Sequence, residues 1–353
     1  MPFKVLKTIS VKNMNKPKIV TFGGGWTEER LESLFKGKNQ SVTFLHAGNR
    51  GEITEQETCE AVRDATVILV NPGSPDISRR VIEAAEKVRL IQSMVVGYDN
   101  VDVQATSEMG IPVANNPGWN AISVAEHTIM LILMTLKKAL YMIRRNEEEG
   151  WTMRDLVKNF DSFGEFKDRT IGIIGLGAIG KEVSKLANAF GARVIYYKRN
   201  RLSVDDEKEL LVDYASFNAL LSRSDIVSLH VPLYDETLGL IGEDEIALMK
   251  DGAILINTSR PGVIEEHAVA VALQEGKLSG AGLDGVNTRV VDGAFFNDSP
   301  LSECDNVVIT PHIAGPTKEA KARGVKQWVE NVCRFLNGEK PLYLVNDVWP
   351  SEQ

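Results

Sequence analysis

Three glycines at a fixed spacing are the first residues of this sequence whose chemistry can be inferred. Gly175, Gly177 and Gly180 form the pattern G-x-G-x-x-G inside the stretch "TIGIIGLGAIGKEVSKLANAFGARVIYYKRNR". The flanking residues predict a strand before the glycines, a helix from about Ala178, and a second strand after the helix. In that context the first glycine permits a tight turn, the second lets a pyrophosphate approach the backbone, and the third lets helix and strand pack closely. The motif therefore predicts a dinucleotide-binding site.

The basic residues at the end of the second strand indicate which dinucleotide would bind. An acidic residue at this point accepts hydrogen bonds from a ribose 2′-OH and would repel a 2′-phosphate. Here Lys198, Arg199 and Arg201 follow the strand, and arginine matches phosphate geometry with paired N–H donors. A basic loop that faces solvent without contacting a ligand is the other interpretation. We expect the cofactor to be NADP(H), with NAD(H) as the less favoured choice.

The elements that position these residues alternate between strands and helices along most of the chain. In its second half six buried strand patterns follow one another, enough for a complete Rossmann sheet. Four more precede them, including "KIVTFGG" and "ATVILVNPG", and two long helical patterns cover Ala121–Glu149 and Lys318–Asn337. We therefore predict an α/β protein. Its Rossmann nucleotide-binding domain, at 119–317, is inserted into a smaller flavodoxin-like α/β substrate domain, made of 1–118 plus 318–353.

Length and composition exclude several classes of protein. A chain of 353 residues can bury a sizeable core, and its net charge of −8 argues against non-specific nucleic-acid binding. Cys59, Cys304 and Cys333 are too widely spaced for a disulfide framework or a CxxC metal site. The most apolar segment, 129–136, is too short to span a bilayer, and the first ten residues lack the apolar stretch of a secretory signal. We expect a cytoplasmic protein without a metal site, nucleic-acid partner or membrane partner.

The chain from about Lys18 to Val345 resembles the D-isomer-specific 2-hydroxyacid dehydrogenase family. The resemblance rests on "VVGYDNVDVQATSEMGIPVANNPGWNAISVAEHTIMLIL", "IGIIGLGAIG", "SLHVPLYDETLGLI", "MKDGAILINTSRPGVI", "GAGLDG" and "NVVITPHIAG", in the family's order and spacing. It implies reversible hydride transfer between a nicotinamide and C2 of a 2-keto or (R)-2-hydroxy acid. It also implies a cleft between the two domains and, usually, a homodimer. The ending "YYKRNR" is similar to that of NADPH-using glyoxylate or hydroxypyruvate reductases.

Two catalytic residues follow from the resemblance. Arg260, in "NTSRPG", matches the family arginine that pairs with the substrate carboxylate and polarises the carbonyl, tasks that suit a fixed guanidinium. His312, in "TPHIAG", matches the acid–base histidine, which supplies or accepts the proton on the substrate oxygen. Pro261 stands where a glycine is usual.

The third catalytic residue of the family is missing. The family places a glutamate five residues after the aspartate of "GLD", where it hydrogen-bonds the histidine, but position 289 is arginine here. Asp292 could substitute after a shift of the loop. Arg289 could instead bind a second anionic group of the substrate, or point to solvent. The site could also be impaired, with little turnover.

The resemblance also assigns residues to the cofactor and to the substrate. Asp284 would contact the nicotinamide carboxamide, and the backbone of Ala178 and Ile179 would hold the pyrophosphate. The cofactor would further be lined by Val231, Pro232 and Thr258. The loop "MVVGYD" matches the family loop whose backbone N–H groups bind the substrate carboxylate, and we expect Val96 and Gly97 to do so.

The sequence thus favours an NADP(H)-dependent 2-ketoacid reductase. Two alternatives stay open: a catalytically impaired dinucleotide-binding regulatory protein on the same fold, and a dehydrogenase of another donor, as in the related formate and phosphite dehydrogenases.

Overall fold

The computed structural model describes residues 16–37, 42–150, 152–159, 162–291 and 294–349. Contacts within the chain divide it into two compact units. The first unit combines Met1–Trp119 with Lys318–Gln353, and the second is Asn120–Thr317. The first boundary falls one residue after the expected break at 118/119, and the second falls at the expected break at 317/318.

The first unit contains a five-stranded sheet in which every pair is parallel. Its order, β2-β1-β3-β4-β5, is the flavodoxin-like order 2-1-3-4-5, which confirms this part of the predicted fold class. The strands are β1 (Lys18–Thr21), β2 (Thr43–His46), β3 (Val67–Val70), β4 (Leu90–Ser93) and β5 (Val113–Ala114), and the helices are α1 (Glu28–Phe35), α2 (Glu55–Val62), α3 (Arg79–Ala84), α4 (Val103–Glu108) and α13 (Lys318–Leu336). The short edge strand β2 was not predicted.

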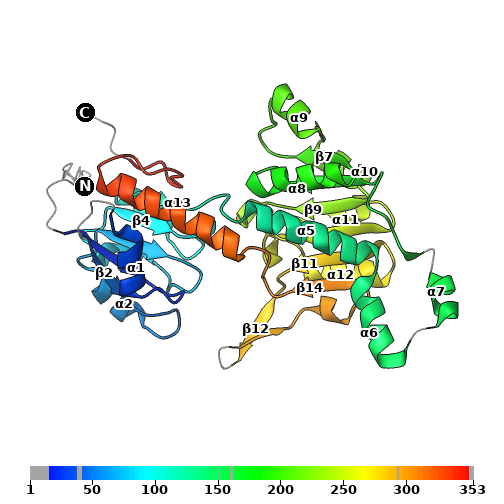
Figure 1. Cartoon of the computed structure of the whole chain (residues 1–353), viewed down its shortest axis with the longest axis horizontal. Helices are drawn as coiled ribbons and strands as arrows, with labels where there is room; N and C mark the ends of the chain where they lie inside the picture. Colours follow the sequence, from blue (N-terminus) through cyan, green and yellow to red (C-terminus); the bar gives the residue numbers. More distant parts are fainter. Residues whose placement is uncertain (1–15, 38–41, 151, 160–161, 292–293, 350–353) are drawn as a thin grey trace. The chain divides into compact units, whose positions relative to one another are not determined.

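Helix α13 completes the first unit from the far end of the chain (Figure 1). Its Trp328 is 1% exposed and meets Trp26 edge-to-face, with ring centroids 5.6 Å apart. Buried Asn331 donates to the side-chain oxygen of Gln92 on β4 at 2.7 Å. The following tail continues the sheet, since Leu344 forms an antiparallel bridge with Ala114 of β5. The first unit is therefore built from both ends of the sequence.

The second unit contains a seven-stranded parallel sheet in the order β14-β11-β10-β9-β6-β7-β8. Counted along this unit the order is 3-2-1-4-5-6-7, a Rossmann sheet with one added strand, as the fold class predicted. The strands are β6 (Thr170–Ile174), β7 (Arg193–Tyr197), β8 (Val212–Tyr214), β9 (Ile226–Leu229), β10 (Ala253–Asn257), β11 (Leu278–Asp284) and β14 (Val307–Thr310). Strand β8 was not predicted, nor was the antiparallel hairpin of β12 (Thr288–Val291) and β13 (Ala294–Asn297).

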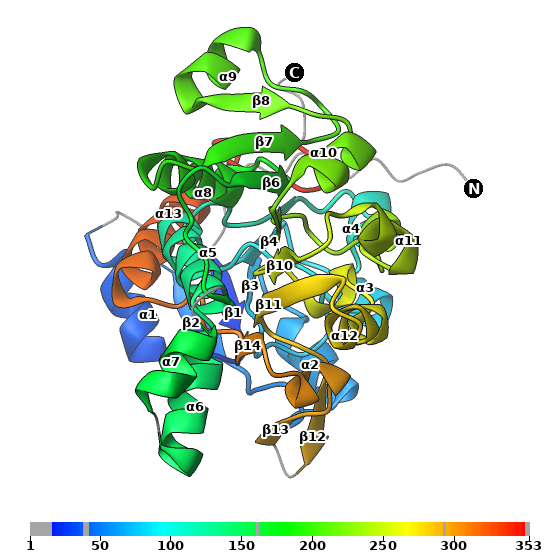
Figure 2. The same ribbon diagram turned by 90° about the vertical axis from the view of Figure 1, so that its right-hand side faces the viewer.

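Helices cover both faces of this sheet, as Figure 2 shows. Helices α5 and α8 pack on one face, and α10, α11 and α12 on the other, each side with its own apolar core. The helices are α5 (Ala121–Leu136), α6 (Ala139–Glu149), α7 (Met153–Asn159), α8 (Ala178–Ala189), α9 (Val204–Leu210), α10 (Phe217–Arg223), α11 (Glu243–Leu248) and α12 (Glu266–Gln274). Both faces of the sheet are covered, and its central strands β6, β9 and β10 are accordingly buried along nearly their whole length.

The prediction of one continuous helix over Ala121–Glu149 is wrong, because the structure has two helices there, α5 and α6. Lys138 adopts a left-handed conformation, with φ 48°, and separates α5 from α6. The carbonyl of Leu136, near the break, accepts a hydrogen bond from the N–H of Gly164 at 2.8 Å. A later segment of the chain thus uses a carbonyl that a continuous helix would have used itself.

Within the described ranges, no helix is both long and apolar enough to cross a membrane. Among the same residues, no three His, Cys, Asp or Glu side chains gather in a way that could hold a metal ion.

Candidate active site

The glycine motif forms the turn between β6 and α8, and two of its glycines are required by close packing. Gly175 has φ 96°, and a Cβ there would lie 2.5 Å from the carbonyl oxygen of His230 and 2.8 Å from Cγ1 of Val231. A Cβ on Gly180 would collide with the carbonyl oxygen of Gly175. The turn is therefore pressed against the end of β9, and Val231, expected to line the cofactor, lies beside it.

Gly177 differs because the space that a side chain would occupy is empty. A Cβ on this residue would meet no atom within 4 Å, although φ is an ordinary −86°. Gly177 is the N-cap of α8 and offers no capping side chain, and the first helical bond runs from Lys181 N to the Gly177 carbonyl. The backbone N–H groups of Ala178 and Ile179 lie before that bond, in the first turn, where helices bind anions. Open space beside uncapped N–H groups fits a pyrophosphate.

The basic residues after β7 have different surroundings. The Arg201 guanidinium binds both carboxylate oxygens of Glu207 at 2.8 Å, and Glu207 also accepts the hydroxyl of buried Tyr196 at 2.7 Å. Arg201 is therefore engaged in holding the β7–α9 loop, and its expected contact with a 2′-phosphate stays a prediction. Within the described part of the chain, Lys198 and Arg199 form no ion pair, and Arg199 is exposed.

Electrostatics confirm that Glu207 is a tightly held carboxylate. The hydrogen bonds from Arg201, and secondly from Tyr196, lower the pKa of Glu207 to about 2. Burial, and secondly the bond to Glu207, raise the pKa of Tyr196 to about 12. At any pH near neutrality, Glu207 therefore stays charged and Tyr196 stays neutral.

A chain of polar side chains runs from α5 to the end of β9. The hydroxyl of Thr128 lies 3.0 Å from that of Thr258, which in turn lies 3.5 Å from Nδ1 of His230. Nε2 of His230 is 2.9 Å from the hydroxyl of Ser228. Burial lowers the pKa of His230 to about 3, so this imidazole is neutral. Thr258 is buried and hydrogen-bonded on both sides, and so braces this part of the predicted cofactor site.

Arg260 lies on the turn that follows β10. Asn257, the last residue of β10, shapes this turn: its amide donates to the Arg260 carbonyl at 2.8 Å, and its oxygen accepts the N–H of Ser259 at 3.0 Å. Arg260 is half-buried and donates to the carbonyl of Ser259 at 3.0 Å. Pro261 begins a short 3₁₀ turn at 261–263, a position that suits its fixed φ.

His312 lies on the turn that follows β14, and Asp284 fixes that turn. One oxygen of Asp284 accepts the Thr310 hydroxyl at 2.6 Å and the N–H of Ile313 at 2.8 Å, and the other accepts the N–H of Ala314 at 2.9 Å. His312 itself is exposed and has φ 56°. The expected carboxamide contact of Asp284 stays a prediction, while its contacts to the His312 turn are what the structure shows.

Gly285 brings the two catalytic candidates onto neighbouring loops. A Cβ on Gly285 would lie 3.3 Å from Nδ1 of His312 and 3.6 Å from Cγ of Pro261, the residue after Arg260. Strands β10, β11 and β14, which these loops follow, are adjacent in the sheet. The carboxyl edge of a parallel sheet is where such folds bind ligands.

The position of the missing glutamate lies on the β12–β13 hairpin. Arg289 pairs through its backbone with Phe296 of β13, and the hairpin is labelled in Figure 2. The Arg289 side chain lies outside what the structure describes, and so does Asp292. The alternatives for this position stay predictions.

Pro232 and the two substrate-binding candidates lie on ordered loops. The Pro232 carbonyl accepts the Thr237 hydroxyl at 2.7 Å. In the first unit, the Ser93 hydroxyl donates to the carbonyl of Gly97 at 2.7 Å, and the Asn115 amide donates to that of Val96 at 2.9 Å. These hydrogen bonds involve the carbonyl groups of Val96 and Gly97. The expected binding of a substrate carboxylate by their N–H groups stays a prediction.

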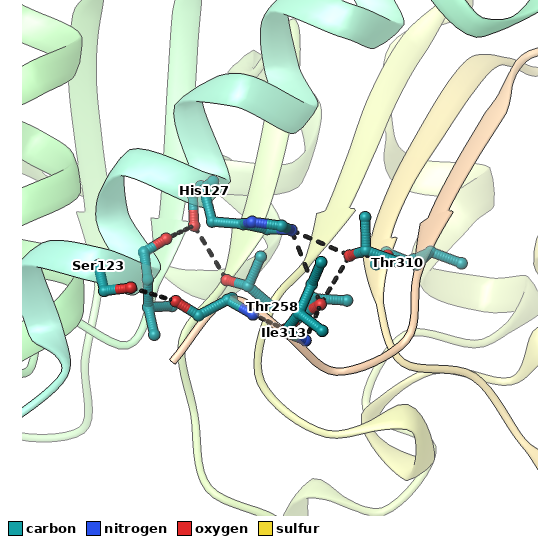
Figure 3. Close-up of polar contacts among 10 residues, drawn as sticks. Ser123, His127, Thr258, Thr310 and Ile313 are labelled. Atoms are coloured by element: carbon teal, nitrogen blue, oxygen red, sulfur yellow. Dashed lines mark hydrogen bonds and ion pairs between the residues drawn. The ribbon is translucent and has the colours of Figure 1, made fainter. Parts of the chain in front are cut away.

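Two polar residues of α5 contact the turn that carries His312, and these contacts were not predicted from the sequence. His127 of α5 approaches the Thr310 hydroxyl at 2.9 Å, and Ser123 donates to the Ala314 carbonyl at 2.5 Å (Figure 3). Each joins residues more than 180 positions apart. No local pattern signals such pairs.

Comparisons with known proteins identify relatives of this chain. The family model for the D-isomer specific 2-hydroxyacid dehydrogenase NAD binding domain matches residues 129–314. The chain is 38% identical over 290 residues to a glyoxylate reductase of Korarchaeum cryptofilum, covering 81% of this chain and 84% of the relative. It is 38% identical over 300 residues to a D-3-phosphoglycerate dehydrogenase of Methanocaldococcus jannaschii, covering 83% and 54%.

Solved structures give the same result. The apo D-mandelate dehydrogenase of Rhodotorula graminis superimposes with a TM-score of 0.84 at 26% identity, covering 96% of this chain and 100% of that one. Together the matches indicate an oxidoreductase with a nicotinamide dinucleotide cofactor. The chain belongs to the D-isomer-specific 2-hydroxyacid dehydrogenase family.

Proposed function

We propose that this protein is an NADP(H)-dependent reductase of 2-keto acids that yields (R)-2-hydroxy acids, with His312 as acid–base and Arg260 as substrate anchor. The observation that carries the proposal is the convergence at Gly285. The His312 ring and Pro261, next to Arg260, both lie within 4 Å of the point that a Cβ on this glycine would occupy, at the carboxyl edge of the sheet.

In this proposal Arg260 binds the substrate carboxylate. Its guanidinium offers paired N–H donors that match the two oxygens of a carboxylate. The same charge polarises the neighbouring keto oxygen, on which negative charge develops during reduction. The bound nicotinamide supplies the hydride. Backbone N–H groups of Val96 and Gly97 would contribute further bonds to the carboxylate.

His312 then completes the reduction by donating a proton to the keto oxygen, and takes it back in the reverse direction. The imidazole is exposed on the turn after β14, and histidine is the side chain that most often performs such proton transfer. Asp284 would lie close to the nicotinamide carboxamide while holding the His312 turn.

Turnover with a panel of 2-keto acids tests the reaction. We expect NADPH oxidation with glyoxylate, hydroxypyruvate or a longer 2-keto acid, and a kcat about 10²–10⁴-fold lower in His312→Asn. His267→Asn is the matched control, because His267 lies exposed on α12, in the same unit. Full activity of His312→Asn, or no turnover of any 2-keto acid by the wild type, would refute the proposal.

The preference for NADPH is assigned to Lys198 and Arg199. Both follow the end of β7, and neither is used in an ion pair by the described residues, whereas Arg201 is bound to Glu207. A charged contact to a 2′-phosphate is worth roughly ten- to a hundredfold in binding. The ratio of kcat/KM for NADPH over NADH should fall by about tenfold in Lys198→Ala and Arg199→Ala. Arg193→Ala, at the other end of β7, should leave that ratio unchanged.

Arg289 is assigned to a second anionic group on the substrate. If it binds one, Arg289→Gln raises KM for 2-keto acids with a distal carboxylate and leaves KM for glyoxylate as it is. An equal change of KM for both substrates would mean that Arg289 does not bind the distal carboxylate.

A further inference from the structure

The backbone at His312 is strained and needs support from its surroundings. The residue has φ 56°, in the left-handed region that few residues other than glycine adopt. Its N–H donates to the carbonyl of Thr310 at 2.9 Å, which closes a tight turn. This conformation sets the direction in which the exposed imidazole leaves the backbone.

Asp284 supplies that support on both sides of His312. The carboxylate binds the hydroxyl of Thr310, two residues before, and the N–H groups of Ile313 and Ala314, one and two residues after. The side chain of Asp284 is only 3% exposed. Hydrogen bonds to a buried carboxylate are strong, and they hold the turn only while the carboxylate itself stays in place.

The carboxylate is in turn held from α5. Nε2 of His127 lies 2.9 Å from the Thr310 hydroxyl and 3.7 Å from an oxygen of Asp284, as Figure 3 illustrates for the His127–Thr310 contact. A carboxylate only accepts, so the single hydroxyl proton of Thr310 goes to Asp284. Nε2 of His127 must then carry the proton that is donated to the Thr310 oxygen. Burial lowers the pKa of His127 and so favours this neutral form. The negative charge of Asp284 acts in the opposite direction, but its effect is the smaller of the two.

We propose that His127 and Thr310 are positioning residues, which orient the Asp284 carboxylate and through it hold the His312 turn in its left-handed conformation. Neither residue touches the reacting atoms in this account. The link to catalysis rests on the proposed role of His312, but the link to the conformation of the turn does not.

Isosteric replacement of the Thr310 hydroxyl tests the proposal. Thr310→Val keeps the shape of the side chain and removes the hydrogen bonds to Asp284 and His127, together with a longer one to the Leu283 carbonyl at 3.3 Å, and Thr310→Ser restores the hydroxyl. We expect kcat to fall at least tenfold in Thr310→Val and to recover most of that loss in Thr310→Ser, with the dissociation constant for NADPH within twofold of wild type. Thr135→Val is the matched control, because its buried hydroxyl bonds only within α5, to the carbonyl of Leu131.

A second pair of variants approaches the network from α5. His127→Gln keeps a donor at a similar reach, and His127→Phe removes it while filling the space. We expect the turnover of His127→Phe to fall with that of Thr310→Val, and the turnover of His127→Gln to lie closer to wild type. This pair stands in for Thr310→Val if that variant does not fold.

Amide hydrogen exchange separates the proposal from the proposed function. The N–H groups of Ile313 and Ala314 are protected by Asp284, so a peptide covering 311–317 should exchange at least tenfold faster in Thr310→Val and His127→Phe than in wild type or Thr135→Val. Unchanged exchange in both variants overturns the proposal, whatever their turnover. A wild type that reduces no 2-keto acid overturns the proposed function, and the exchange data still decide whether the turn is held in this way.

Discussion

His230 is a half-buried histidine whose protonation opposes folding. Its pKa is lowered to about 3 by burial, against about 6.5 in an unfolded chain. Between these values the unfolded state binds one more proton than the folded state. The folded state therefore loses stability as pH falls below about 6.5, by up to about 1.4 kcal/mol per pH unit.

The variant His230→Gln removes this proton uptake. Measured by urea denaturation between about pH 6 and pH 4, its free energy of unfolding should fall less steeply than that of wild type, by about 1 kcal/mol per pH unit. His267→Gln, on the exposed side of α12, should keep the wild-type slope. Parallel slopes for wild type and His230→Gln would show that the imidazole is already protonated in the folded state.

Glu207 stabilises the loop after β7 through Arg201 and Tyr196. Because the Glu207 side chain is only 10% exposed, replacing it with glutamine removes a nearly buried charge and one of the two oxygens that accept hydrogen bonds from Arg201 and Tyr196. Glu207→Gln should lower the free energy of unfolding by about 1–2 kcal/mol, a range reduced because Arg201 is half exposed. Glu209→Gln, exposed on the same helix, should change it by less than about 0.5 kcal/mol. If Glu207→Gln and Glu209→Gln changed the free energy of unfolding equally, the contact between Glu207 and Arg201 would contribute nothing to stability.

At the scale of residues, the sequence predicts what depends on neighbours in the chain. The three glycines could be found because a turn and a helix start are local. The partner of Arg201 was missed because Glu207 becomes its neighbour only once α9 has formed. His127 was missed for a stronger reason: Thr310 lies 183 positions away, and only the packing of α5 on the sheet brings them together.

At the scale of elements, the turn between β6 and α8 separates two functions of glycine. Gly175 is needed for folding, since its φ and the nearby His230 carbonyl leave no room for a side chain. Gly177 has ordinary backbone angles and open space beside it, so folding does not require a glycine at this position. We infer that the missing side chain leaves room for a bound cofactor.

Alanine at each position should therefore give opposite results. Gly177→Ala should unfold within about 0.5 kcal/mol of wild type but bind NADPH at least about tenfold more weakly, because the new methyl group occupies the path of the pyrophosphate. Gly175→Ala should be destabilised by about 2 kcal/mol or more. Thermal unfolding and a fluorescence titration with NADPH measure the two effects. Wild-type affinity in Gly177→Ala would place the pyrophosphate elsewhere.

The elements predicted from the sequence were those with long apolar runs. The four-residue edge strand β2 and the three-residue β8 have partners on one side only, and their sequences carry weak patterns. The break between α5 and α6 falls in a sequence with continuous helical character. Its cause, Gly164 binding the Leu136 carbonyl, lies 28 residues further on, outside any local window.

At the scale of the whole molecule, the first unit depends on a helix from the end of the chain. Trp328 of α13 is buried against Trp26 and Phe35, with ring centroids 5.6 and 6.2 Å away. Truncating a buried tryptophan to alanine costs about 3–5 kcal/mol. Trp328→Ala should therefore destabilise the first unit specifically.

Intrinsic fluorescence can follow that unit because four of the five tryptophans, all but Trp151, belong to it. In Trp328→Ala we expect the fluorescence transition to move to lower urea concentration, while amide exchange of the β6–β9 peptides stays as in wild type. Val204→Ala, an exposed change in the second unit, should move neither. A joint shift of both signals would mean that the two units unfold as one.

The arrangement of α13 also has a consequence for synthesis on the ribosome. The nascent chain presents the five strands of the first unit early, but the helix that covers one face of them follows only after residues 120–317 have emerged. At about 5–20 residues per second this delay lasts roughly 10–40 s. During that time the apolar face later covered by Trp328 and Phe335 is open to water and to other chains, while the Rossmann sheet can fold in full. We therefore expect the nascent first unit to bind chaperones until α13 has emerged.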